Sequence, residues 1–493
     1  MVGIKYAAGE EPLDVEELNR VALAVDLGRD EDKIDYWTPV PIAVESKIAK
    51  KAIVSAHSGS IDAAKHDPLG LLARPPPAIT AAAIDKLKEV GCGTCGPRGF
   101  YGTTTDHLQL EKTIAEFLGT DAAIVYSHHV STISSVIPAF VKKDDLVLLH
   151  ADPVATCSLV ASGIRLSKAA NVSTWTSCED LEKLLAASAS MLGTDPPLTF
   201  TSDVLPPDMC IRTDQFRIWI MCEGNQAGLD LKRVVELKRA HHAYLLLDDT
   251  LCVGVTGARG RGTFERCGVR VCDVDILIGS LEHAFGSTGG FCAGRADIIE
   301  HQRLYGDGYC FSASAPSCLT IAASKAIEFL DTAEGKTRLK SLQANIKSFV
   351  RAVGKQVGGK LELISCSSSY AQVIRLPPTV TANEVYARIT SAKTQPVQVS
   401  PLGLALLRMF QPVNFGDHID QLLQINISSE MTAKDVAVIV SELNAALIAP
   451  AAPVQKSRPK TTRSGGCARG GLPDPTVVAR VVTFGTITDA FTI

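Results

Sequence analysis

The chain has 493 residues, 46% of them hydrophobic and 21% charged, which is typical of a folded protein with room for two domains and excludes a globally disordered chain. Its formal net charge of −4 provides no overall electrostatic attraction to nucleic acid.

The N-terminal residues carry acidic side chains and no apolar core, so we expect no secretory signal there. The 14 cysteines have no regular spacing, and we expect reduced thiols in a chain that faces the cytosol. No uncharged apolar run reaches the roughly 20 residues that a membrane-spanning helix needs.

Residues 1–75 show little periodicity and are predicted to form an N-terminal arm over the core. A helix follows over residues 79–90, with Ile84, Leu87 and Val90 on one face. Residues 91–103 are too rich in glycine for the interior of a helix or strand. The next helix covers residues 107–118 and stops at Gly119.

Strands and helices then alternate, which predicts a mostly parallel sheet under helices in a large α/β domain over residues 76–330. The remainder predicts a smaller α+β domain over residues 331–449 and a flexible tail over residues 450–493. The expected strands are residues 122–126, 146–150, 217–222, 243–247, 274–279, 361–365, 371–376 and 423–427, and the expected helices are residues 231–240, 322–330 and 339–357.

Two of the buried strands end in polar residues. Asp248 and Asp249 follow one strand, and Ser280 follows the next. In an open α/β sheet the functional site lies beyond the carboxyl ends of the strands. We therefore expect Asp248 and residues 280–290 to face one crevice.

Several local patterns have a simpler interpretation than the motif they resemble. Residues 91–96 fit G-x-G-x-x-G but follow a helix and run into Pro97, which is the wrong context for a dinucleotide site. Cys92 and Cys95 have no second pair at zinc-site spacing. The doublets at 128–129 and 241–242 are adjacent histidines, whose side chains point apart, so we predict no metal site. The basic residues 456–463 could contact anionic lipid, although a solvated tail is the preferred interpretation.

Residues 279–286 read G-S-L-E-H-A-F-G. This segment resembles the lysine motif G-T-L-S-K-A-F-G of the α-oxoamine synthases, which are fold-type I pyridoxal-phosphate enzymes. The resemblance implies a mostly parallel seven-stranded sheet with a smaller C-terminal domain. The family lysine forms a Schiff base with the cofactor, whereas this chain has His283, which lacks a primary amine. We interpret His283 as structural or vestigial, with a general base as the alternative.

Other family positions also differ. The resemblance places Leu251 where the histidine on the ring hydroxyl belongs and Thr156 where the stacking histidine belongs. Residues 128–130 replace the phosphate-binding S-G-F, and residues 420–426 lack the arginine for the substrate carboxylate. Asp248 keeps the position of the pyridinium partner. The resemblance therefore implies no catalytic residue in this chain.

Two strings point to a subgroup of the family. Residues 93–103, here the first motif, and residues 301–316, here the second motif, resemble the non-catalytic subunits of serine palmitoyltransferase. The resemblance implies that Cys95, Arg98, Phe100 and Tyr101 lie at the dimer interface and substrate pocket. It also implies that Ser312 and Ala313 reach the phosphate of a pyridoxal 5′-phosphate held by the partner.

The resemblance implies a heterodimer with the lysine-bearing subunit 2, at the cytosolic face of the endoplasmic reticulum membrane. Such complexes condense L-serine with palmitoyl-CoA to 3-ketosphinganine in sphingolipid synthesis. The subunits of this subgroup begin with a membrane-spanning helix that is not visible here. One alternative is an autonomous α-oxoamine synthase, which the missing lysine opposes. The other is a regulatory scaffold, which gives no reason for the two motifs.

Overall fold

The computed structural model describes residues 61–94, 96–150, 157–169, 171–191, 217–357, 359–390, 397–398, 400–401 and 422–448. The predicted tail and residues 1–60 of the predicted arm lie outside the described residues. Among the helices that the structure describes, none combines the length and the apolar character that crossing a membrane requires.

The described elements of the large domain alternate as the sequence predicts. They are α2 (Pro77–Val90), α3 (Thr105–Leu118), β2 (Ala122–Tyr126), α4 (His129–Phe140), β3 (Leu146–His150), α5 (Cys157–Ser167), β4 (Asn171–Trp175), α6 (Cys178–Met191), β5 (Ile218–Glu223), α7 (Leu231–Ala240), β6 (Tyr244–Asp248), α8 (Thr263–Cys267), a 3-10 turn (Val271–Asp273), β7 (Ile276–Ser280), β8 (Gly290–Gly294), α9 (Ala296–Tyr305), α10 (Asp307–Cys310) and α11 (Ser317–Phe329).

Within the described residues, seven strands form the large sheet in the order β2-β8-β7-β6-β5-β3-β4. All neighbours from β7 to β4 run parallel, whereas β8 runs antiparallel to both β2 and β7. The predicted fold class, a mostly parallel seven-stranded sheet with helices, is confirmed.

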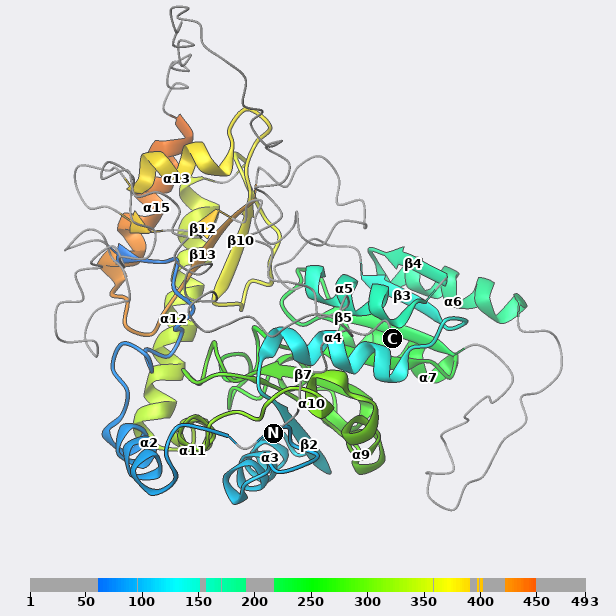
Figure 1. The fold of residues 1–493 in the computed structure, drawn as a ribbon. Helices are drawn as coiled ribbons and strands as arrows, with labels where there is room; N and C mark the ends of the chain where they lie inside the picture. The colour runs from blue at the N-terminus through cyan, green and yellow to red at the C-terminus, as the bar shows by residue number, and fades with distance from the viewer. Residues whose placement is uncertain are drawn as a thin grey trace, which may run out of the picture. The chain divides into compact units, whose positions relative to one another are not determined.

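Helices cover both faces of this sheet (Figure 1). Alternate side chains of β2 enter different cores: Ile124 and Tyr126 pack with α4 and α9, and Ala123 and Val125 face α3. Because successive side chains of a strand point to opposite faces, apolar runs such as β2 supply both cores at once.

The smaller domain follows α11. Its elements are α12 (Ala333–Gln356), β9 (Glu362–Leu363), β10 (Ala371–Arg375), α13 (Ala382–Thr390), β11 (Val397–Gln398), β12 (Ser400–Pro401), β13 (Leu422–Asn426) and α15 (Ala433–Ile448). An antiparallel sheet of order β12-β13-β10-β9 is its centre. The described part of the arm joins this domain, since β1 (Ile61–Asp62) pairs with β11 and the Asn426 amide donates to the Ala63 carbonyl at 2.7 Å.

Strand β8 shows why part of the sheet was not predicted. It begins and ends with glycine, and such a pattern predicts a turn rather than a buried strand. A Cβ atom on Gly290 would lie 2.3 Å from Oγ1 of Thr132 on α4. The glycine is therefore required for close packing of helix on strand, and not for a turn.

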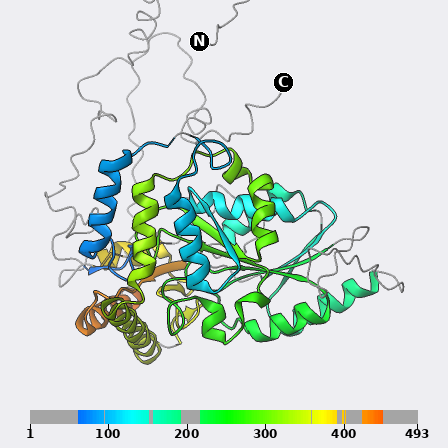
Figure 2. The ribbon, with the colours of Figure 1, turned by 90° about the horizontal axis from the view of Figure 1, so that it is seen from below.

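Helix α2 forms as predicted, but its apolar face stays open to solvent. Ile84, Leu87 and Val90 are 44%, 44% and 51% exposed, and only Ile79 of this helix is buried. The helix packs along α11, which lies between α2 and α3 (Figure 2). The described residues therefore leave the apolar stripe of α2 uncovered.

Candidate functional site

The two strands with polar ends meet as predicted. β6 and β7 are parallel neighbours, with Asp248 in register with Ile278, and the Asp249 amide donates to the Ile278 carbonyl at 2.9 Å. Asp248 and Ser280 are both buried. The carboxyl ends of these strands therefore bring Asp248 and the segment after Ser280 together at one edge of the large sheet, the place that we call the crevice.

Three histidine rings gather in this crevice. The ring of His283 lies 4.7 Å from that of His66 and 5.6 Å from that of His129, measured between centroids. His129, in the first turn of α4, also forms a hydrogen bond of 3.2 Å between its Nε2 and Oγ1 of Thr250. We call His66, His129 and His283 the histidine cluster.

His66 connects the cluster to the smaller domain. The amide nitrogen of Gln424 donates to its Nε2 at 3.1 Å, which leaves the proton on Nδ1, 2.8 Å from the hydroxyl oxygen of Tyr370. Sequence reasoning missed His66, Tyr370 and Gln424, because no local pattern marks them and their partners lie hundreds of residues away in the chain.

Burial keeps the cluster uncharged at neutral pH. It lowers the pKa of His66 to about 4, with a further contribution from His129. It lowers the pKa of His283 well below its ordinary value, and His66 and His129 act in the same direction. For His129, burial outweighs the opposing effect of Asp248 and Glu282, and its pKa is lowered as well.

These residues do not fit a bound pyridoxal phosphate. The cluster offers no primary amine for the aldehyde, and its neutral imidazoles supply no fixed positive charge for a phosphate. His129 is at the start of α4, and Leu251 is buried in the core. Asp248 is present, with its Oδ1 accepting from the Thr250 amide at 3.1 Å. Thr156, the position of the family's stacking histidine, lies outside the described residues.

The two histidines of the 128–129 doublet lie in different surroundings. His128 is exposed while His129 is buried, so the two side chains point apart, as the sequence predicts. In the part of the chain that the structure describes, no group of three or more His, Cys, Asp or Glu residues is placed to hold a metal ion.

The two motifs lie against each other. Pro97 and Ala313 form an antiparallel bridge, and the Ser314 amide donates to the Gly96 carbonyl at 3.0 Å. The Ser127 hydroxyl donates to the Ala313 carbonyl. A Cβ atom on Gly102 would lie 1.8 Å from the Gly96 carbonyl oxygen and 2.6 Å from the Ser314 hydroxyl oxygen, so the motifs meet where only glycine fits.

A buried ionic group lies beneath the motifs. Glu111 pairs with Arg98 at 2.9 Å and with Arg303 at 3.4 Å, and its Oε1 accepts from the Val125 amide at 3.0 Å. Arg303 also donates to the Tyr309 hydroxyl at 2.8 Å. Arg98 and Arg303 lie 5.2 and 5.7 Å from the centre of the Tyr309 ring. Arg98, predicted at the interface, is thus buried and joins the loop to β2 and α9.

Other motif residues point outward. Phe100, Tyr101 and Phe311 are 70%, 84% and 79% exposed. Directly after Phe311, Ser312 is half-buried and Ala313 is exposed. Cys95 lies outside the described residues. The joined motifs therefore present an apolar surface, which we call the aromatic surface and define by Phe100, Tyr101 and Phe311.

The chain resembles known proteins along most of the described region. Residues 229–443 match the aminotransferase class I and II family. The chain is 34% identical to long chain base biosynthesis protein 1b of Oryza sativa subsp. japonica over 63% of each chain. It is 30% identical to serine palmitoyltransferase 1 of Dictyostelium discoideum, over 68% of this chain and 69% of that protein. The matched part thus spans less than two thirds of the rice protein.

A solved structure supports the fold. It is a variant serine palmitoyltransferase from S. paucimobilis with a bound PLP–myriocin aldimine, and it is 23% identical to this chain. The superposition covers 78% of this chain and 87% of that one, with a TM-score of 0.63.

Gly102→Ala is expected to destabilise the chain by about 1–3 kcal/mol or more, because the added methyl group overpacks the contact with Gly96 and Ser314. Urea unfolding followed by circular dichroism measures the change. Gly99→Ala is the matched control in the same loop, since a Cβ atom there meets nothing within 4 Å. Equal stabilities of the two variants would contradict the close approach of the motifs.

Acidification is expected to destabilise the chain through the histidine cluster. The unfolded His66 has a pKa near 6.5 and the folded one about 4, so below pH 6.5 the unfolded chain binds a proton that the folded chain does not. Stability therefore falls as the pH drops from about 6.5 toward 4, by at most about 3 kcal/mol for this group.

The measurement is the urea midpoint at pH 7 and pH 5. His66→Gln should weaken the pH dependence, because the variant removes the titrating group and keeps a polar side chain. His128→Gln, on the exposed neighbour of His129, should leave it unchanged. An unchanged pH dependence in His66→Gln would refute the assignment.

Proposed function

Because the chain belongs to the serine palmitoyltransferase 1 (long chain base biosynthesis protein 1) family, we propose that it is the non-catalytic subunit of a serine palmitoyltransferase. The complex condenses L-serine with palmitoyl-CoA, releasing CO2 and CoA and giving 3-ketosphinganine for sphingolipid synthesis. A lysine-bearing homologue, subunit 2, holds pyridoxal 5′-phosphate, and the heterodimer acts at the cytosolic face of the endoplasmic reticulum membrane.

The observation that carries this proposal is the aromatic surface beside a crevice that does not fit the cofactor. Three large side chains stand in solvent on motifs whose glycine and ionic contacts hold them rigidly. Exposed aromatic clusters on a fixed frame are typical of protein interfaces. The exposed stripe of α2, with Ile84, Leu87 and Val90, adds a second uncovered apolar area. Ser312 and Ala313 would meet the partner's cofactor phosphate from the same motif.

The two alternatives make different demands on the residues. An autonomous synthase needs an amine where His283 stands, and the neutral cluster opposes it. A pure scaffold would also keep Arg98, Glu111, Arg303 and Tyr309, because these residues hold the fold together. A scaffold would need the exposed aromatic side chains too, so the difference lies in Ser312 and Ala313, which only a subunit with a part in the active site would direct to the partner's cofactor phosphate.

The decisive experiment co-expresses the chain with a lysine-bearing homologue and measures serine-dependent CoA release. Activity should require both chains, and the lysine should be essential only in the partner. Full activity of the partner without this chain would overturn the proposal, and so would activity of this chain alone.

Borohydride reduction with pyridoxal phosphate is expected to leave no covalent label on the segment around His283, because the cluster has no primary amine. Peptide mass spectrometry of residues 279–294 reads the label. His283→Lys alone should not restore condensation, since His129 and Leu251 remain in the family's cofactor positions. A stoichiometric label on the wild-type segment is the result that would sink the prediction.

Removing the aromatic surface is expected to break the complex. The triple variant Phe100→Ser, Tyr101→Ser, Phe311→Ser should weaken partner binding at least about tenfold, since buried aromatic anchors often contribute more than about 1 kcal/mol each. Co-purification and CoA release measure it. Val172→Ser, an exposed apolar side chain on β4 at the opposite edge of the sheet, is the control. Equal loss in both variants would mean that the surface has no special role.

A further inference from the structure

The loop of residues 311–316, which joins α10 to α11, is held by two side chains from other elements. Ser127, directly after β2, donates its hydroxyl proton to the carbonyl oxygen of Ala313. In the first turn of α3, Nε2 of His107 lies 2.9 Å from the carbonyl oxygen of Ala315. Both side chains are buried. Two backbone carbonyls of the loop are therefore fixed by side chains that belong to neither of the helices it joins.

The proton of His107 is on the nitrogen that faces the loop. The amide of Thr104 donates to Nδ1 at 3.1 Å, and because an amide N–H can only donate, Nδ1 accepts and Nε2 carries the proton. Nε2 therefore donates to the Ala315 carbonyl. Burial, with Arg98 acting in the same direction, lowers the pKa of His107 to about 4. The neutral tautomer, and with it the hydrogen bond to the loop, thus persists at neutral pH.

The first motif holds the same loop through its backbone. The Ser314 amide, which lies in sequence between the two fixed carbonyls, donates to the Gly96 carbonyl at 3.0 Å. Three consecutive residues of the loop are thus each held by one hydrogen bond to their backbone. Because this backbone is fixed, it sets the direction in which the half-buried Ser312 and the exposed Ala313 are presented. Groups that contact a ligand are effective only when supporting hydrogen bonds hold them in place.

We propose that Ser127 and His107 are positioning residues of the shared active site, which hold the loop so that Ser312 and Ala313 meet the phosphate of the partner's cofactor. The inference rests on the proposed function and adds to it two buried residues that act through the loop. Without one of these hydrogen bonds the loop must be ordered when the cofactor binds, and that ordering weakens binding.

The test uses the full chain in complex with its co-expressed partner. Ser127→Ala removes one hydroxyl group and adds no volume. The dissociation constant of pyridoxal phosphate, read from the absorbance of the cofactor bound to the partner, should rise about three- to tenfold, the scale of one neutral hydrogen bond.

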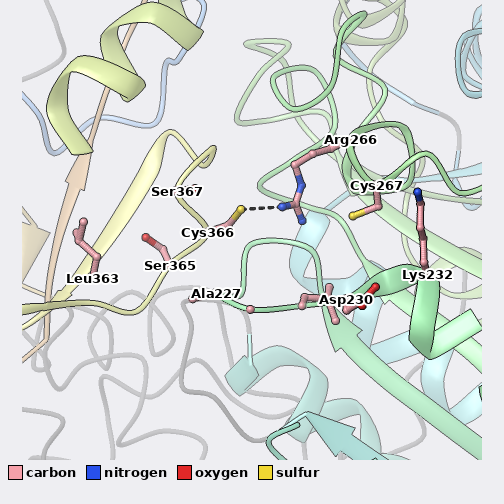
Figure 3. A pocket seen from close by; sticks show the side chains of 11 residues that line it. Ala227, Asp230, Lys232, Arg266, Cys267, Leu363, Ser365, Cys366 and Ser367 are labelled. Carbon is pink, nitrogen blue, oxygen red and sulfur yellow. Dashed lines mark hydrogen bonds between the residues drawn. The ribbon is translucent and has the colours of Figure 1, made fainter. Parts of the chain in front are cut away.

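Ser365→Ala is the matched control. Ser365 is also a buried serine with a backbone contact, since its hydroxyl oxygen accepts from the Val373 amide at 3.0 Å. It lines a cavity between α8 and the segment after β9 (Figure 3), and no residue of the loop is among the described residues that line this cavity. This variant should leave the dissociation constant unchanged.

Two variants of His107 separate positioning from packing. His107→Leu removes the donor and should raise the dissociation constant by a factor similar to that of Ser127→Ala. His107→Gln supplies an amide N–H donor and should restore most of the affinity, which a loss of packing alone would not allow.

Hydrogen exchange of the complex shows separately whether the loop is held. Exchange of residues 311–316 should be faster in Ser127→Ala and unchanged in Ser365→Ala. Unchanged exchange in Ser127→Ala, or faster exchange with an unchanged dissociation constant, would overturn the positioning role and leave the proposed function standing. Equal constants in His107→Leu and His107→Gln would do the same for His107. A wild-type pair that forms no active complex would overturn the proposed function and this inference together.

Discussion

The carboxylate of Glu111 is the contact on which the described surface depends. It is buried with Arg98 of the first motif, pairs with the half-buried Arg303 of the second, and accepts from the backbone of β2. Arg303 also pairs with Glu300 at 2.9 Å, and both guanidinium groups face the Tyr309 ring. Removing Glu111 would leave the buried Arg98 without its anion, so this pair is the part of the group whose loss costs most.

The residues of the two motifs have two different roles, which the sequence alone does not distinguish. Arg98, Arg303 and Tyr309 hold loop, strand and helix together, whereas Phe100 and Phe311 are displayed on that frame. A motif shared with a family is therefore weak evidence for an interface wherever its residues are buried within their own chain. The evidence lies in the exposed residues, which cost stability in water and contribute nothing to this chain's core.

The sequence predicted what is local and not what is assembled from distant parts. Helix α7 and the strands β2 and β6 were found because their apolar runs and end residues lie within a few positions of each other. The ends of β6 and β7 also located the crevice, since parallel strands bring their carboxyl ends together. The contacts of His66 with Tyr370 and Gln424 span 304 and 358 residues, and no periodicity reports on such pairs.

The histidine cluster explains how the crevice can stay packed with side chains when this chain holds no charged cofactor there. A lysine at position 283 would place a cation among buried groups, at a large desolvation cost unless an anion paired with it. A neutral imidazole fills the same space, contacts His66 and His129, and carries no charge at neutral pH. Because His66 in turn bonds to Tyr370 and Gln424, the replacement joins the arm, the large domain and the smaller domain. Position 283, which carries the reactive lysine in a catalytic homologue, here carries a side chain that packs between the domains. That packing stabilises the conformation that we propose binds the partner.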